Sequence, residues 1–323
     1  MVIDKPELSN CSKIAAGIYN PVVFKRLTKS WMLDEVFPEI NSFYGSLEEK
    51  WNCKLITERN IVKLFSEQQE IDLWKKKASG ELNGYLDNTI YTDPSYQNVS
   101  VSEFGYSKVL RSGNLDVPGF LEQTRNYLKS EESYLEDQFD FSELAVSNPI
   151  FYKKIIAKNI IFCEGHLIKN NPYFKYIPFK PAKGEVLEIL SPDLKIENDI
   201  INKNAFIMDL DKSTFKTGAT YNWEDLTDIP TEAGKKEIET KLKKITNASY
   251  KIISHKAGVR PSVIDRRPVM GSHPKYSSVF VFNGLGTKGV MLAPYFAQHF
   301  IDYITNKIVL NKEVDVRRFD KFL

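Results

Sequence analysis

Three glycines near the C-terminal end of the chain form a segment that could hold an anionic group. The segment runs from Asn283 to Pro294, with glycines at 284, 286 and 289, between an apolar run over 278–283 and a helical pattern over 290–304. Glycine allows positive φ and close approach of the backbone to a ligand. The start of a helix presents unpaired N–H groups and a partial positive charge. The arrangement suits a phosphate or a reduced flavin, although an ordinary strand-to-helix turn has the same spacing.

Arg260 is the second candidate for chemistry. It lies between Val259 and Pro261, in a segment apolar enough for partial burial, and a buried guanidinium needs an anionic partner. A ligand carboxylate can bind it through two hydrogen bonds, which would make Arg260 a substrate anchor. The local sequence by itself favours the alternative, an ion pair with an acid of the protein such as Asp265.

Strands and helices alternate at both ends of the chain, and the middle is richer in antiparallel patterns. This order predicts two intertwined domains, one α/β and one mostly antiparallel. We expect strands at 2–4, 184–190 and 205–217, and a strand buried on both faces at 159–163. We expect a hairpin or meander over 53–75. The predicted helices are 30–51 (one helix, or two broken near Pro38), 113–129 after an initial turn, and 231–245 with a solvated lysine-rich face.

Composition narrows the class of protein. The chain has 323 residues, of which 42% are hydrophobic, so it can bury a large core and is not a disordered protein. Its net charge of +2 gives no support to nucleic-acid binding. We expect no membrane span and no signal peptide, and therefore a cytoplasmic protein. The three cysteines, which we expect to be reduced and buried, and the four scattered histidines have neither disulfide nor metal-ligand spacing.

The chain resembles the flavin-dependent D-amino-acid oxidase family, and its glycine oxidase branch most of all. The resemblance is most specific in the last hundred residues, from Gly258 to Gly271 and from Val279 to Pro294. Other matching segments are Ile14-Ala15-Ala16-Gly17-Ile18, Ile161-Phe162-Cys163-Glu164-Gly165, Phe179 to Glu185 and Thr217-Gly218-Ala219-Thr220-Tyr221.

The resemblance implies an α/β fold, α+β overall. An FAD-binding Rossmann-like three-layer domain, lacking its N-terminal unit, would be interleaved with an antiparallel-sheet substrate domain. The FAD-binding domain would comprise 1–52, 110–180 and 265–323, and the substrate domain 53–109 and 181–264.

The resemblance also implies roles for particular residues. Arg260 would bind the substrate carboxylate, and the turn from Leu285 to Met291 would lie against the pyrimidine edge of a noncovalent FAD. The remaining implied cofactor residues are Asp4 (ribose hydroxyls), Ala16, Gly17 and Ile18 (flavin), and Gly165 (close backbone approach); within the turn they are Leu285, Gly286, Thr287, Lys288, Gly289, Val290 and Met291.

The sequence departs from the family pattern in two respects. The family's Gly-x-Gly-x-x-Gly unit does not precede Asp4, so we expect either that the sequence starts downstream of the natural start or that the chain is a shortened form. Phe206 and Thr287 stand where the glycine oxidase pattern has a tyrosine and an arginine. Glycine itself is therefore doubtful as substrate, and a larger or less polar amine is expected.

The resemblance implies oxidation of the C–N bond of a small amine or amino acid by hydride transfer to flavin N5. Two alternatives remain open. One is the oxidase step of tRNA wobble-uridine modification, and the other is a flavin-free remnant that acts as a binding module. The oligomeric state and the electron acceptor are not predicted.

Overall fold

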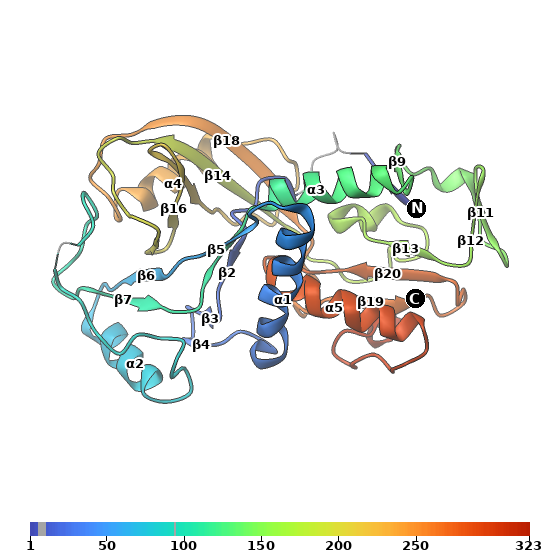
Figure 1. Cartoon of the computed structure of the whole chain (residues 1–323), viewed down its shortest axis with the longest axis horizontal. Helices are drawn as coiled ribbons and strands as arrows, with labels where there is room; N and C mark the ends of the chain where they lie inside the picture. The colour runs from blue at the N-terminus through green and yellow to red at the C-terminus, as the bar shows by residue number, and fades with distance from the viewer. Residues whose placement is uncertain (6–10, 94) are drawn as a thin grey trace.

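A seven-stranded, mostly antiparallel sheet lies in one half of the molecule, and several small sheets with three helices form the other (Figure 1). The computed structural model describes residues 1–5, 11–93 and 95–323. Only one neighbouring pair in the large sheet, β15 with β6, is parallel. The strands, in spatial order, are β18 (Lys251–Arg260), β14 (Ala182–Leu190), β17 (Thr214–Gly218), β16 (Phe206–Asp211), β15 (Ile200–Asn202), β6 (Ile61–Leu64) and β7 (Tyr106–Val109).

Alternation along these strands gives the large sheet two apolar faces, each covered by a helix. Helix α4 (Glu232–Leu242) packs on one face against a cluster that includes Leu187 and Phe215. Helix α2 (Gln68–Ala78) packs through Trp74 with the opposite face, in a cluster that includes Met208. The sheet is therefore a rigid platform on which side chains of one strand can be assigned to one face or the other.

The remaining sheets are smaller. Strand β13 is parallel to β20, and β1 is parallel to β9, but these two pairs belong to separate sheets. The small sheets are β13 (Ile160–Phe162) with β20 (Val279–Asn283) and β19 (Val269–Ser272); β1 (Val2–Asp4) with β9 (Tyr134–Glu136); β10 (Leu144–Ala145) with β11 (Ile150–Tyr152) and β12 (Ile155–Ala157); β2 (Ile18–Tyr19) with β8 (Gly113–Leu115) and β5 (Ile56–Glu58); and β3 (Val22–Val23) with β4 (Thr28–Lys29). Strands β2, β3, β4 and β5 lie on the same side of helix α1 (Leu33–Trp51) as the large sheet, and β9, β11, β12, β13, β19 and β20 lie on its other side (Figure 1).

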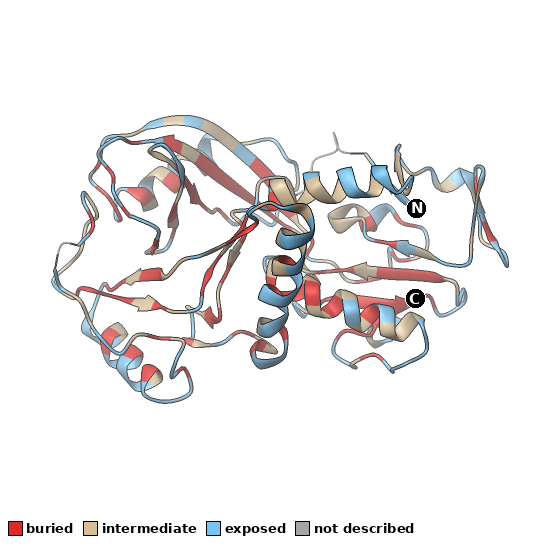
Figure 2. Cartoon of the chain, viewed as in Figure 1, coloured by how far each residue is buried: buried red, intermediate tan, exposed pale blue. Residues whose placement is uncertain are grey.

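Helices α1 and α5 (Gly289–Ile304) pack against each other beside these sheets, and α3 (Val117–Ser130) lies above them (Figure 1). Val36, Ile40 and Tyr44 bury one stripe of α1 at a spacing of four residues. Phe296 and Phe300 do the same on α5. Figure 2 shows this burial on one side of each helix, with exposed residues on the other. The start of α5 is thereby fixed in position.

The mixed α/β fold class predicted from the sequence is confirmed. Several predicted elements are present, among them α4, β14 and β20 followed by α5. Segment 205–217, expected as one β segment, forms two antiparallel strands, β16 and β17. Of the two alternatives left open for 30–51, the single helix is the one observed, because α1 runs through Pro38 without a break.

Three predictions about local structure are wrong. Segment 53–75 is not a hairpin, because β5 pairs with β8, β6 pairs with β7 and β15, and α2 begins at Gln68. Strand β13 is not buried on both faces: it pairs only with β20 among the described strands, and Ile161 is 40% exposed. Cys163, expected to be buried, is exposed, and Cys11 and Cys53 are only half-buried.

Candidate functional site

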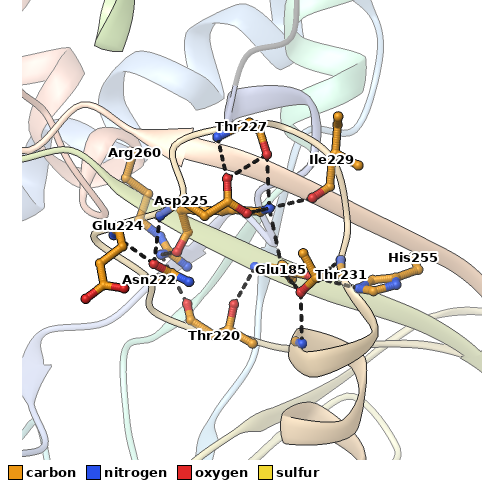
Figure 3. A network of polar contacts seen from close by, with 12 residues as sticks. Glu185, Thr220, Asn222, Glu224, Asp225, Thr227, Ile229, Thr231, His255 and Arg260 are labelled. Atoms are coloured by element: carbon orange, nitrogen blue, oxygen red, sulfur yellow. Dashed lines mark hydrogen bonds and ion pairs between the residues drawn. The ribbon is translucent and has the colours of Figure 1, made fainter.

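Arg260 ends strand β18 with its guanidinium half-buried and surrounded by neutral groups (Figure 3). Its Nη1 donates hydrogen bonds to the carbonyl oxygens of Lys183 (3.3 Å) and Thr220 (3.2 Å). Its Cζ lies 4.2 Å from the centroid of the Tyr221 ring, within the range of a cation–π contact. Burial lowers the pKa of the Arg260 guanidinium, although arginine stays charged in proteins. The site therefore holds a positive charge with hydrogen-bonding capacity to spare.

A glycine on the neighbouring strand makes room for this guanidinium. In the β14–β18 pairing, Arg260 lies opposite Ala182. Gly184 is two positions further along β14, so it lies on the same face of the sheet as Ala182. A Cβ atom at Gly184 would stand 2.0 Å from Nη2 of Arg260. Any other residue at position 184 would therefore displace the guanidinium.

Asp265 is not the partner of Arg260, which rejects the internal ion pair favoured by the local sequence. The Asp265 carboxylate accepts a hydrogen bond from Nε of Arg318 at 2.8 Å. No ion pair joins Arg260 to an acidic group among residues 1–5, 11–93 and 95–323. An external anion would supply the missing partner.

The predicted glycine turn follows β20 and leads into α5. Gly284 and Gly286 have φ of 76° and 57°, and a Cβ at Gly284 would lie 2.7 Å from Cγ2 of Val263. A Cβ at Gly286 would lie 3.3 Å from Oγ of Ser262, which follows Arg260 by two residues. The turn thus packs against the segment that carries Arg260.

Gly165 lies beside the same turn, because β13, which precedes it, is parallel to β20. The Asn283 side chain donates from Nδ2 to the carbonyl oxygen of Gly165 at 2.9 Å and accepts from the N–H of Gly284 at 2.7 Å. Gly165 has φ of 58°, and no heavy atom lies within 4 Å of the place where its Cβ would be. The backbone is therefore open to a ligand on that side.

Lys288 is the charged residue of the turn. Its Nζ donates to the hydroxyl of Ser30, a neutral partner, and no acidic group of the described chain pairs with it. Burial, with a smaller contribution from the nearby Arg267 charge, lowers the pKa of Lys288 to about 8. A half-buried cation without an acid at the start of a helix favours an anionic ligand there.

The segment Ala16-Gly17-Ile18 approaches the same region. Gly17 accepts a hydrogen bond from the N–H of Leu115 at 3.0 Å and has φ of 71°, and a Cβ there would lie 2.0 Å from the Leu115 carbonyl oxygen. Tyr19, which follows, packs in the core cluster that also contains Leu285, Val290 and Met291. Strand β2 (Ile18–Tyr19) contacts α5, whereas the side chains of Ala16 and Ile18 pack in a separate cluster with α2. The structure thus brings the end of this segment close to α5.

Other predicted cofactor residues are placed less directly. Met291 is buried in the core, so only its backbone could reach a ligand, and Thr287 is exposed. Asp4 ends β1 and accepts a hydrogen bond from Oη of Tyr134 at 3.1 Å. Its sheet is not hydrogen-bonded to the sheet of β13 and β20, and no contact described for Asp4 joins it to the other candidates.

Sequence reasoning missed Ser30 and Lys183. Nothing in the sequence around Ser30 distinguishes it, because its contact with Lys288 is made across 258 positions. Lys183 had a usable signal: it lies two positions from Glu185, and so on the same face, in a largely apolar strand. Charged residues on one face of a buried strand indicate that each is buried together with a polar or oppositely charged partner.

The residues of the turn fit a flavin cofactor. The open backbone at Gly165, the positive φ values at Gly284 and Gly286, and the uncompensated charge of Lys288 lie within one region. These features suit a planar group with negative charge at one edge. Among the described residues, no group of three or more acidic, histidine or cysteine side chains could hold a metal ion. In the same part of the chain, no helix has the length and apolar character needed to span a membrane.

Comparison with known proteins agrees with this geometry. Residues 147–303 match the family model of the FAD-dependent oxidoreductases. A glycine oxidase of Bacillus subtilis is 26% identical over 171 residues, which cover 51% of this chain and 46% of the relative. The chain thus spans about half the length of this curated relative. The tRNA 5-methylaminomethyl-2-thiouridine biosynthesis bifunctional protein MnmC of Marinobacter nauticus is 23% identical over 167 residues, covering 47% of this chain and 26% of that protein.

The fold is shared with solved structures over nearly the whole chain. The crystal structure of glycine oxidase from Bacillus cereus superposes with a TM-score of 0.77 at 17% identity, covering 94% of this chain and 89% of that chain. The chain therefore has the fold of the glycine oxidases. Residues 147–303 thus match the FAD-dependent oxidoreductases, and the chain is similar to the glycine oxidases.

Proposed function

We propose that this protein is an FAD-dependent oxidoreductase that oxidises the C–N bond of a small amine or amino acid carrying a carboxylate. The observation that carries the proposal is the Arg260 guanidinium, which is half-buried and bonded only to carbonyl oxygens among its described hydrogen-bond partners. A carboxylate would complete its coordination with charge-assisted hydrogen bonds. The similarity to glycine oxidases supports the same substrate class.

The residues of the chain would bind the substrate and the cofactor and orient them relative to each other. Arg260 would hold the carboxylate, and Gly165, the turn 285–291 and segment 16–18 would hold a noncovalent FAD. When bound, FAD supplies the acceptor for the hydride lost by the amine-bearing carbon. Fixing the carboxylate restricts the substrate to one orientation, and this reduces the entropic part of the barrier. Phe206 is half-buried on β16, opposite Gly218, and adds no charged group to the site.

Replacement of Arg260 tests the proposal. We expect Arg260→Ala to weaken binding of a carboxylate probe such as acetate by about 2 kcal/mol, the scale of a lost charge-assisted hydrogen bond. Acetate would be titrated into FAD-loaded protein and followed by calorimetry. Arg317→Ala serves as the control, because Arg317 pairs with Asp315 on the surface away from this network. Unchanged acetate affinity in Arg260→Ala would reject the role of Arg260.

The match to the tRNA-modifying protein favours a second candidate, oxidation of a modified uridine in tRNA. It predicts the same use of FAD but a much larger substrate. A gel-shift titration with unmodified bulk tRNA distinguishes the two. Binding that weakens steeply with added salt would favour the second candidate, because phosphate contacts release counterions. No binding would favour a free amine or amino acid.

A further inference from the structure

A fully buried lysine lies behind the Arg260 site and contacts one loop several times. Lys183 is 0% exposed, and its ammonium binds the carboxylate of Asp225, the carbonyl oxygen of Ile229 (2.5 Å) and the hydroxyl of Thr227 (3.3 Å). All three partners belong to the loop that joins β17 to α4, residues 219–231, which we call the β17–α4 loop (Figure 3). The ammonium also holds the pKa of Asp225 at about 2.

Glu185, two positions further along the same strand, fixes both ends of this loop. Its carboxylate accepts hydrogen bonds from the N–H of Thr231 (2.9 Å) and from its hydroxyl (2.8 Å), and contacts Nε2 of His255 at 2.7 Å. Its backbone N–H donates to the Thr220 hydroxyl at 2.9 Å. Thr231 in turn caps α4 by accepting from the N–H of Gly234 at 3.0 Å.

The same loop supplies two of the three contacts of the Arg260 guanidinium. These are the carbonyl oxygen of Thr220 and the ring of Tyr221. Asn222, the next residue, pairs with the backbone of Lys183 through hydrogen bonds of 2.8 and 3.0 Å. The loop therefore passes from the hidden face of β14, where the Lys183 side chain lies, to the face on which Gly184 makes room for Arg260.

Burial of an ammonium is costly, and pairing it with an acid often gives no more stability than an apolar side chain of similar volume. A hydrogen-bonded buried charge does, however, restrict its partners to one arrangement. If one partner moves away, it leaves the buried charge and its own polar group unpaired. Here the three hydrogen-bond partners of the Lys183 ammonium come from five consecutive residues, 225–229, and Glu185 on β14 adds only a longer ion pair of 3.9 Å. The arrangement that Lys183 restricts is thus the conformation of the β17–α4 loop.

We propose that Lys183 is a positioning residue for Arg260, which acts by holding the β17–α4 loop so that Thr220 and Tyr221 keep the guanidinium in one orientation. The proposal rests on the proposed function only for the identity of the ligand, a carboxylate. The orientation of Arg260 is a property of the chain and can be measured without substrate.

The first test observes Arg260 directly. In FAD-loaded protein labelled with ¹⁵N-arginine, the Nε–Hε signal of Arg260 is assigned by its loss in Arg260→Lys. We expect Lys183→Met to shift and broaden this signal, because the loop is released and the guanidinium samples several orientations. The control is Lys108→Met. Lys108 lies on β7, at the other edge of the same sheet, and its ammonium pairs with the Asp199 carboxylate at 3.1 Å. An unchanged Arg260 signal in folded Lys183→Met overturns the proposal.

The second test uses acetate as the probe for the same variants. We expect Lys183→Met to raise the Kd of acetate about fivefold, the scale of one lost hydrogen bond, with the affinity for FAD retained. Lys108→Met should leave both unchanged. If the parent protein does not bind acetate, the proposed function fails, while the Arg260 signal still decides the positioning role. Acetate affinity unchanged in Lys183→Met, with binding intact in the parent, counts against that role.

Asp225→Asn covers the case in which Lys183→Met does not fold. Asp225 lies in the loop with its side chain 32% exposed, and asparagine keeps an acceptor oxygen for the ammonium. The variant removes the charge and should give a smaller change of the same sign in the Arg260 signal and in acetate affinity. Signals and affinity identical to the parent in both respects overturn the proposal.

Discussion

At the scale of single residues, Lys288 in the glycine turn lowers the stability of the protein without a ligand. Burial lowers its pKa from 10.5 to about 8, so between these values the unfolded chain binds more protons than the folded one. The stability contributed by this group is therefore lowest below pH 8 and rises with pH up to about 10.5. We expect Lys288→Met to be more stable than the parent at pH 7, by up to about 3 kcal/mol, with the difference vanishing near pH 10.5.

Urea unfolding of both proteins at several pH values between 7 and 10.5 measures this difference. Lys54→Met is a suitable control, because Lys54 is exposed and its ion pair with Glu48 is at the surface. Two parallel curves of unfolding free energy against pH would show that the burial of Lys288 does not destabilise the folded protein. A confirmed difference would mean that the fold keeps an unfavourable cation at the turn where an anionic ligand is expected.

The residue scale also shows how far the sequence alone could lead. The glycine turn and the burial of Arg260 follow from neighbouring residues, and both were predictable. The neighbour rule failed for Asp265, because Arg318, 53 positions later, takes this carboxylate. The contact between Lys288 and Ser30 spans 258 positions and has no local signal. Local sequence predicts which groups are chemically competent, but folding decides their partners.

At the scale of elements, pairing partners account for the wrong predictions. Strands β5 and β6 are separated by two residues, a spacing typical of hairpins, yet they belong to different sheets. Their partners, β8 for one and β7 and β15 for the other, lie far along the chain. By contrast, β20 and α5 form a unit whose pattern is local, and their bounds agree closely with the prediction.

Helix α1 provides a prediction at this scale. Pro38 lies inside the helix, where it has no N–H to donate to the preceding turn, and its side chain is exposed. Helix packing against α5 maintains α1 despite this loss. We expect Pro38→Ala to stabilise the protein by about 1–3 kcal/mol, because alanine restores the donor and has the higher helix propensity. Urea unfolding measures the change, with Glu39→Ala at the adjacent exposed position expected to stay within about 0.5 kcal/mol of the parent. Lower stability of Pro38→Ala would show that the proline is needed for the packing of α1.

At the scale of the whole molecule, the candidate cofactor residues come from three separate parts of the chain, 16–18, 165 and 285–291, and Arg260 comes from the large sheet. A ligand that binds the folded state alone stabilises it by RT ln(1 + [L]/Kd), which is about 2.7 kcal/mol at a hundredfold excess over Kd. We therefore expect FAD to raise the midpoint of thermal unfolding, in the parent and equally in Arg260→Ala, because in our proposal Arg260 contacts the substrate and not the cofactor.

Scanning calorimetry with and without FAD separates the alternatives at this scale. The first outcome is that FAD raises the unfolding midpoint equally in both proteins, with acetate raising it further only in the parent. This result would assign the cofactor and the substrate to distinct groups of residues that unfold together. A shift in the parent that is lost in Arg260→Ala would place Arg260 in the cofactor site instead. The absence of any shift would favour a binding module without flavin, because a cofactor that contacts three distant segments of the folded chain must stabilise it.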